Sequence, residues 1–149
     1  MTEFNSDELL NNRAALDDVN RNVVEEFRAN GGKVGGPFEG VDILLLHNTG
    51  AKSGQRRVSP LASFTVDGRL LIVGSYGGAP KDPAWVHNLR ANPDVHVEIG
   101  TDAYDATAHE LSRDERDVLY DKVVAAAPAF GEYQAKTDRV IPLFELIRA

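Results

Sequence analysis

The residues best suited to chemistry are three cations gathered in one short segment that contains two glycines. Residues 50–57 have the sequence Gly-Ala-Lys-Ser-Gly-Gln-Arg-Arg, which places Lys52, Arg56 and Arg57 beside the hydroxyl of Ser53. Such side chains donate charge-assisted hydrogen bonds to phosphate, and glycines let the backbone approach a ligand closely. The segment is not a Walker A loop, because its lysine follows an alanine and the next element is predicted to be a strand. Composition alone fits an anion-binding loop and a solvated hairpin loop equally well.

The charge of the whole chain narrows the choice of ligand. The protein has 16 Lys and Arg against 23 Asp and Glu, a net charge of −7, and no acidic residue lies between Asp42 and Asp67. A nucleic-acid partner would require a basic face. An acidic protein with one compact cationic loop is better suited to a small anion, so we predict such a ligand and no nucleic-acid partner.

A second segment, residues 74–92, has features of a ligand site. Ser75, Tyr76 and two glycines follow a predicted strand, and Asp82 with Pro83 is typical of a helix start, whose free N–H groups suit an anion. Trp85 would project from the first turn of that helix. The alternative is that the glycines only form a tight turn and that Trp85 belongs to the core, the commoner fate of a lone tryptophan.

Other chemistries find little support in the sequence. The chain has no cysteine, which excludes thiolate zinc sites, iron–sulfur clusters and cysteine nucleophiles. The four histidines lack metal-ligand spacing, so we predict no metal site. Neither a Gly-x-Ser-x-Gly elbow nor a Gly-x-Gly-x-x-Gly fingerprint occurs. Any chemistry is therefore expected to come from a bound cofactor.

The elements that must position these segments are mostly strands joined by hairpins. A first helix, capped by Asn5 or Ser6, is predicted to end at Gly31-Gly32, and residues 33–41 are predicted to be loop. Hydrophobic patterning predicts strands at 42–49, 58–66, 70–75, 95–99, 104–111 and 141–147. Pro60 suits an edge strand or a bulge, and Asp67-Gly68 is a hairpin signal.

Two further helices complete the predicted order. One is short and begins with Asp82 as its N-cap; the other begins with the capping box of Ser112 and Glu115 and runs to about residue 127, with residues 129–139 irregular. Strands that follow one another with few helices favour an α+β, mostly antiparallel sheet or small barrel. We expect a single domain overall, divided into a helix and lead-in at 1–32 and a barrel at 33–149.

The sequence contains neither a secretory signal nor an apolar run of the roughly 20 residues that cross a bilayer, which predicts a cytoplasmic protein. Peripheral membrane contact and the oligomeric state are left open.

Two long motifs resemble those of the deazaflavin-dependent nitroreductase family. They are Thr49 to Arg57 followed by Pro60-Leu61, and Ser75 to Trp85 followed by Asn88-Leu89 and Ala91-Asn92-Pro93, with Thr137-Asp138-Arg139 and Ile141-Pro142 as a shorter third match. The resemblance covers roughly residues 35–147. It implies a split β-barrel related to the FMN-binding pyridoxamine-phosphate-oxidase fold, and binding of coenzyme F420, a deazaflavin with a phosphate and an oligoglutamate tail.

The resemblance also assigns roles to residues. Lys52, Ser53 and Arg57 would hold the phosphate and tail, with Arg56 as a further tail contact. Ser75 would donate a hydrogen bond to the acceptor, and Tyr133 would be an aromatic wall or second donor. The cofactor-binding residues it implies are Ala51, Lys52, Ser53, Arg57, Val58, Pro60, Leu61, Ala62, Val73, Gly74, Ser75, Tyr76, Ala84, Trp85 and Asn88.

The implied reaction is hydride transfer from reduced F420 to an electron-poor acceptor, with quinones as physiological acceptors and nitroaromatics as adventitious ones. Ala127 and Phe130 stand where the nitroreducing branch has tyrosines, which predicts weak reduction of bicyclic nitroimidazoles. Two alternatives accompany this hypothesis. One is an FMN-binding split-barrel oxidoreductase, and the other is a non-catalytic F420-binding or carrier protein.

Overall fold

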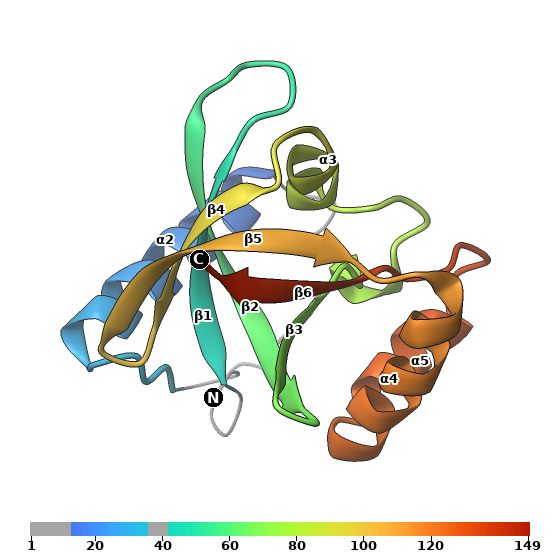
Figure 1. Cartoon of the computed structure of the whole chain (residues 1–149). Coiled ribbons are helices and arrows are strands. Elements are labelled where there is room, and N and C mark those ends of the chain that lie inside the picture. The colour runs from blue at the N-terminus through green and yellow to red at the C-terminus, as the bar shows by residue number, and fades with distance from the viewer. Residues whose placement is uncertain (1–12, 36–41) are drawn as a thin grey trace.

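The strands close into a single antiparallel barrel. The computed structural model describes residues 13–35 and 42–149, and gives side chains from Val19 onward. The strands are β1 (Ile43–Thr49), β2 (Arg56–Val66), β3 (Arg69–Val73), β4 (Asp94–Ile99), β5 (Asp102–Glu110) and β6 (Leu143–Arg148). They close in the order β1-β2-β3-β6-β5-β4, with each neighbouring pair antiparallel (Figure 1). The predicted α+β antiparallel barrel is confirmed.

Alternation along β1 and β2 separates an inner from an outer face. Leu44 and Leu46 belong to the core inside the barrel, whereas Ile43 and Leu45 pack outside. The register pairs Leu44 with Leu61 and Ile43 with Ala62, so Leu61 points inward and Ala62 outward. Even-numbered residues of β2 therefore lie on the outer face of the barrel.

The barrel interior is closed at one end by α3 (Ala84–Ala91). Trp85, Val86 and Leu89 of this helix pack among the inward side chains, and the Trp85 ring meets Phe144 edge-on at 5.8 Å. Trp85 is thus a core residue, as in the second of the two interpretations of the sequence.

Helices cover two parts of the outer face of β2. Helix α2 (Arg13–Ala29) packs Val23 and Phe27 over one part, next to Val58 and Ala62. Helices α4 (Arg113–Ala126) and α5 (Ala129–Ala135) cover the other part. None of the described helices is long and apolar enough to cross a bilayer.

The chain turns sharply after α2. A Cβ on Gly32 would lie 2.5 Å from the Cα of Gly100, so the backbone after α2 touches the β4–β5 turn. The predicted end of the first helix at Gly31-Gly32 agrees with this arrangement, while its predicted caps Asn5 and Ser6 lie outside the described residues, as do residues 36–41 of the predicted loop.

Two local predictions are wrong. Residues 129–139 contain the helix α5, because Pro128, which ends α4, also occupies the N-cap of α5. Asp82 does not cap α3: Pro83 holds that position, and the Asp82 carboxylate pairs with arginines instead. In contrast, Ser112 caps α4 by accepting from the Glu115 N–H, as the capping box predicts.

Candidate functional site

The three predicted cations lie at the base and tip of a hairpin that projects beyond the barrel (Figure 1). We call residues 50–57 the cationic hairpin. Its loop is closed by hydrogen bonds from Gly50 N to Gln55 O (2.9 Å) and from Gly54 N to Gly50 O (3.0 Å). A side chain at Gly50 would collide with Ser53 Oγ unless Ser53 moved, and Gly54 has φ of 68°, a region that favours glycine.

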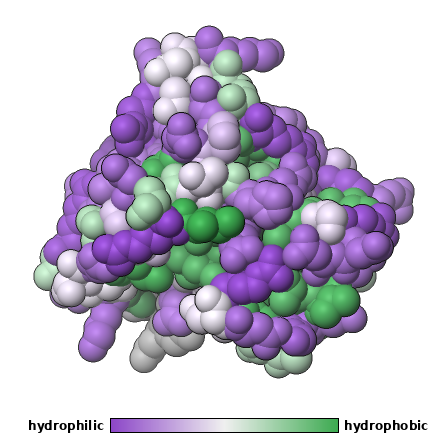
Figure 2. Space-filling model, viewed as in Figure 1, coloured by the Kyte–Doolittle hydropathy of each residue, from purple (hydrophilic) through white to green (hydrophobic). Residues whose placement is uncertain are grey.

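The charges of the cationic hairpin are directed to solvent. Lys52, Arg56 and Arg57 are exposed, and none forms an ion pair with another residue in the described part of the chain. In the space-filling view the projecting hairpin is mostly purple and white, unlike the green patches lower on the molecule (Figure 2). Three unpaired cations on a projecting loop are available to an external anion.

The two arginines face opposite sides of the strand. Arg56 pairs with Thr49 on the outer face, and Arg57 pairs with the buried Asn48 on the inner face. Arg57 therefore lies on the same side of the hairpin as α3, and Arg56 lies on the other side. A single group of a ligand that lies level with these strands would therefore contact one arginine and not both. This agrees with the separate roles that the sequence resemblance implies for the two residues.

A buried amide network ties the cationic hairpin to α3. Asn88 Oδ1 accepts from Ala51 N at 2.9 Å, and Asn88 Nδ2 donates to Asn48 Oδ1 at 2.8 Å. Asn48 Nδ2 in turn donates to Leu46 O and to Ser59 Oγ. The hairpin is thus fixed at its base, while its tip stays exposed.

The first half of β2 has one neighbour within the described residues. Residues 56–62 pair with β1, and β3 joins only from Ser63 onward. Ser63 N donates to Asp42 O, so alternation of the antiparallel ladder turns the backbone groups of residues 58, 60 and 62 away from β1. Pro60 has no N–H to leave unpaired there, which is why a proline is tolerated. Of the outer side chains of this part of β2, Val58 and Ala62 pack against the cluster that contains Val23 and Phe27 of α2.

The second motif forms a compact turn at the end of β3, and we call residues 74–82 the clamped turn. Gly74 N donates to Pro142 O at 2.9 Å, and Gly78 N donates to Ser75 O at 2.9 Å. Tyr76, Gly77 and Gly78 all have positive φ, at 47°, 64° and 81°. A tyrosine in this region is strained, and such strain is found where surrounding contacts hold the backbone in place.

Arg139 supplies those contacts. Its guanidinium donates to Gly74 O (3.1 Å), Ser75 O (2.8 Å), Ala79 O (2.9 Å) and Asp82 Oδ1 (2.8 Å). Its side chain is only 15% exposed. Burial lowers the pKa of the Arg139 guanidinium, and the Asp82 carboxylate opposes that shift.

Ser75 and Tyr133 belong to two segments that contact each other, the clamped turn and α5. Ser75 is half-buried, and its hydroxyl makes no hydrogen bond within the described residues. A Cβ on Gly78 would lie 2.8 Å from Tyr133 O, which shows that α5 is seated directly on the clamped turn. The Tyr133 ring packs edge-on against Phe130 at 5.3 Å.

The predicted site residues therefore fall into two groups. Most lie on the cationic hairpin, on the outer face of β2 or in the clamped turn. Leu61 and Trp85 do not, because their side chains point into the barrel. Val73 lies on the outer face beneath α4 and α5, and Ala84 is exposed at the start of α3.

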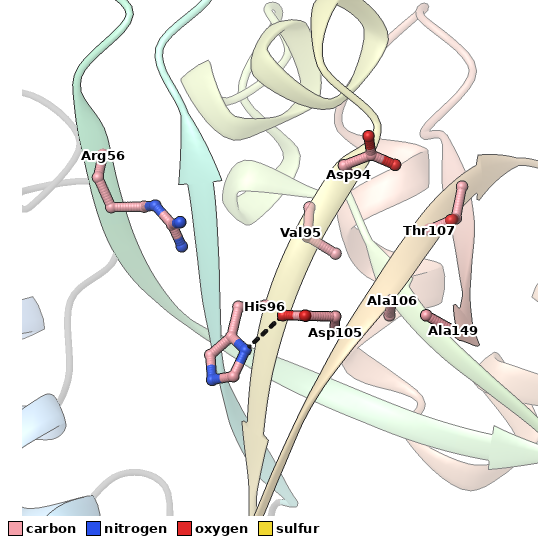
Figure 3. A pocket seen from close by; sticks show the side chains of 8 residues that line it. All are labelled: Arg56, Asp94, Val95, His96, Asp105, Ala106, Thr107 and Ala149. Carbon is pink, nitrogen blue, oxygen red and sulfur yellow. Dashed lines mark hydrogen bonds and ion pairs between the residues drawn. The ribbon is translucent and has the colours of Figure 1, made fainter.

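A separate hollow of about 300 Å³ lies between the base of the cationic hairpin and β4–β5 (Figure 3). Arg56 points toward it from one side, and Asp94 and the hydrogen-bonded pair His96–Asp105 (2.9 Å) line the other. Of the residues predicted to contact the cofactor, it is lined only by Arg56, the further tail contact. Two carboxylates also make it a poor site for a ligand that carries several negative charges.

A charged cluster ties α2 to β1 and β4. Glu98 accepts from Arg28 Nη2 at 2.9 Å and is 2.5 Å from His47 Nε2. The hydrogen bond from Arg28, opposed by burial and aided by His47, lowers the pKa of Glu98 to about 2. Within residues 13–35 and 42–149, no group of three His, Asp or Glu side chains is arranged to hold a metal ion.

Sequence patterns do not reveal the roles of Arg139, Asp82 and Asn48. Arg139 belongs to the third matched motif, but its partners lie some sixty positions away. Asp82 looks like a helix cap because it precedes Pro83, and Asn48 sits in a run predicted only as strand. The one available signal was Asn48 itself, because a polar side chain in a buried strand needs a hydrogen-bond partner.

Comparison with known proteins agrees with the geometry. The family model described as F420H(2)-dependent quinone reductase matches residues 19–147. An F420H(2)-dependent quinone reductase of Mycobacterium tuberculosis (strain ATCC 25618 / H37Rv) is 37% identical over 126 residues, which cover 82% of this chain and 85% of that protein.

Comparison with solved structures agrees with this family match and with the barrel fold. The F420-H2 dependent reductase FDR-A is 45% identical, with a TM-score of 0.63 over 70% of this chain and 92% of that chain. The haem storage protein HutZ of Vibrio cholerae, at 16% identity, has a TM-score of 0.55 over 85% of this chain and 87% of its own, and shares the fold alone. The chain belongs to the F420H(2)-dependent quinone reductase family.

Proposed function

We propose that the cationic hairpin, the outer face of β2 and the clamped turn together form the cofactor and acceptor site of this protein, with Ser75 as hydrogen-bond donor to the acceptor. The protein is an F420-dependent oxidoreductase that reduces an electron-poor acceptor such as a quinone. When bound, the reduced cofactor supplies the hydride.

The charges of the cationic hairpin support this assignment. Lys52 and Arg57 are exposed and have no ion-pair partner among the described residues, so a phosphate or carboxylate would not have to displace a protein anion. Asn88 holds the backbone at Ala51 in place. The hairpin can thus bind a phosphate and an acidic tail while its base stays fixed to α3.

The position of Ser75 supports its role as donor. Its carbonyl is fixed by Arg139 and Gly78 N, while its hydroxyl is left without an intramolecular partner among the described residues. A donor on a fixed backbone can stabilise negative charge that develops on an acceptor oxygen. Tyr133, on the helix that contacts the clamped turn, would exclude water and stack against the acceptor.

This single observation, an unpartnered hydroxyl on a rigidly held turn, leads to the test. Ser75→Ala should lower kcat for menadione by about 100- to 1,000-fold, while F420 affinity changes little, since removing one donor of this kind costs about 2.7–4 kcal/mol. Ser53→Ala is the matched control, because it removes a hydroxyl from the cationic hairpin and should act on affinity. An unchanged kcat in Ser75→Ala would exclude the proposed donor role.

The acceptor range is a further part of the proposal. Ala127 and Phe130 leave α5 and its surroundings with fewer hydroxyls, so small quinones should react and bicyclic nitroimidazoles should react weakly or not at all. Steady-state rates over a panel of both classes test this. Tight F420 binding without reduction of any quinone, nitroaromatic or enone would instead favour the carrier hypothesis.

We also propose that the protein works in the cytoplasm. Cell fractionation should recover it in the soluble fraction, and recovery with washed membranes would indicate peripheral contact with the bilayer.

A further inference from the structure

Arg139 bridges segments that lie far apart in sequence. It follows α5 in the chain, yet its guanidinium is enclosed by three carbonyls and one carboxylate of residues 74–82. Its own backbone carbonyl accepts from Gln134 Nε2 at 2.8 Å, so the side chain extends from a fixed base.

The clamped turn needs a cation at this place. Three successive residues with positive φ curl the chain so that the carbonyls of Gly74, Ser75 and Ala79 converge on one point. Converging carbonyl dipoles repel one another unless a donor lies between them. A planar guanidinium, with five N–H groups in a fixed fork, satisfies all three and the Asp82 carboxylate at once.

Asp82 extends the arrangement to the rest of the barrel. Its Oδ1 accepts from Arg139, and its Oδ2 lies 3.2 Å from Arg90 Nη1. Arg90 belongs to α3 and binds Glu110 of β5 through two further hydrogen bonds, of 2.9 and 2.8 Å. The turn is therefore tied to the same helix whose Asn88 holds the cationic hairpin.

We infer that Arg139, oriented by Asp82, is a positioning residue for the reaction: it fixes the backbone of Ser75 so that the Ser75 hydroxyl faces the acceptor. This inference rests on the proposed role of Ser75. Arg139 itself contacts neither cofactor nor acceptor and acts only through the turn.

Lysine cannot replace Arg139 in this role. A lysine has three donors on one nitrogen and lacks the planar fork, so it can keep the ion pair with Asp82 but cannot reach all three carbonyls. We therefore expect Arg139→Lys to fold and still show a smaller version of the defect of Arg139→Ala.

The test measures activity and local backbone stability separately. In Arg139→Ala, kcat for menadione should fall by about 10- to 100-fold, the scale expected when a reacting group is misplaced by about 1 Å, with F420 affinity nearly unchanged. Amide hydrogen exchange at Gly78 and Ala79, measured without cofactor, should become faster. Millimolar guanidinium should restore part of the lost kcat in Arg139→Ala.

Arg69→Ala is the matched control. The Arg69 guanidinium also forms tertiary hydrogen bonds, with Glu145 and Glu115, but it contacts no residue of the clamped turn. It should change neither exchange in residues 76–79 nor kcat, and guanidinium should not affect it. An equal loss of kcat in both arginine variants, or unchanged exchange in both Arg139 variants, would overturn the inference.

The outcomes also separate this inference from the donor role of Ser75. If Ser75→Ala keeps the wild-type kcat while Arg139→Ala makes amide hydrogen exchange in the clamped turn faster, the donor role of Ser75 is wrong. Arg139 would still be shown to hold the backbone of the turn. If Ser75→Ala loses activity but both Arg139 variants keep wild-type kcat and exchange, the positioning role of Arg139 is wrong.

Discussion

The cationic hairpin and the clamped turn satisfy their polar groups in opposite ways. In the hairpin, Lys52 and Arg57 have no partner among the described residues and extend into solvent. In the turn, the carbonyls of Gly74, Ser75 and Ala79 all accept hydrogen bonds from one buried guanidinium. In the proposed site the hairpin would gain contacts from a ligand, whereas the backbone of the turn is already held in place by contacts within the described chain.

This difference suggests that the two regions have different roles in binding and in the reaction. A flexible, multiply charged tail can be held by mobile side chains, because its binding requires charge more than exact placement. A hydrogen bond that must meet a developing charge requires a donor fixed in advance. Substitutions in the hairpin should therefore change affinity, and substitutions in the turn should change stability and kcat.

Adding a methyl group to a glycine of each region should give the largest contrast. Gly78 has φ of 81°, and its Cβ would lie 2.8 Å from Tyr133 O, whereas Gly54 has φ of 68° and open space around its Cβ. Gly78→Ala should lower the free energy of unfolding by about 2–4 kcal/mol, from strain and overpacking together, and Gly54→Ala by about 1 kcal/mol. Urea denaturation measures both, and equal losses would contradict the comparison.

Removing hairpin cations should affect binding without affecting stability. Lys52→Ala and Arg57→Ala should each weaken F420 binding by about 1.5–3 kcal/mol, because each removes a charge-assisted contact, with an unchanged Tm. Fluorescence titration at two salt concentrations gives the affinities. Lys122→Ala, which removes one charge from α4, is the control and should bind F420 like the wild type.

The link between the two regions can be broken at Asn88. Asn88→Ala leaves Ala51 N and Asn48 Oδ1 without their partner, which should cost about 2 kcal/mol of stability and also weaken F420 binding. Asn92→Ala, at the other end of α3, is the matched control and should do neither. A variant that loses stability but binds F420 normally would show that the hairpin does not depend on this anchor.

The smallest effect is expected from acid titration of Glu98, which ties α2 to β4 through Arg28. Its folded-state pKa of about 2 lies below the ordinary value of 4.5, so its contribution is present above pH 4.5 and is lost as the pH falls toward 2. Because Arg28 is half exposed, we expect about 1 kcal/mol. Glu98→Gln should flatten this part of the stability profile, and Glu145→Gln, which breaks a bond on the far side, should leave the α2 amides protected.

The fold could be predicted largely from local patterns. Alternation located the strands, and Asp67-Gly68 does form a tight hairpin turn, with φ of 53° and 76°. The missed helix α5 contains Gly131, a poor helix former, and owes its packing to α4, since a Cβ on Gly131 would lie 3.1 Å from Val124 Cγ1. Such tertiary support leaves no trace in local sequence.

The arrangement of the candidate site was predictable only in part for the same reason. Charge and glycine spacing identify the cationic hairpin as a candidate, because its side chains neighbour one another in sequence. The clamped turn depends on Arg139, whose partners are brought to it by the folded chain. Pattern analysis likewise could not tell that Leu61 and Trp85 point into the barrel, since that requires the register of β2 and the placement of α3.

The edge of β2 that has no strand partner among the described residues has a consequence for the behaviour of the protein at high concentration. An unpaired strand edge is a template on which another chain can add a strand and begin to aggregate. Here the edge is interrupted at its centre by Pro60, which offers a carbonyl but no N–H, so a regular intermolecular ladder cannot extend along it. Replacing Pro60 would restore that ladder, and the protein would then be expected to lose solubility before it loses its fold.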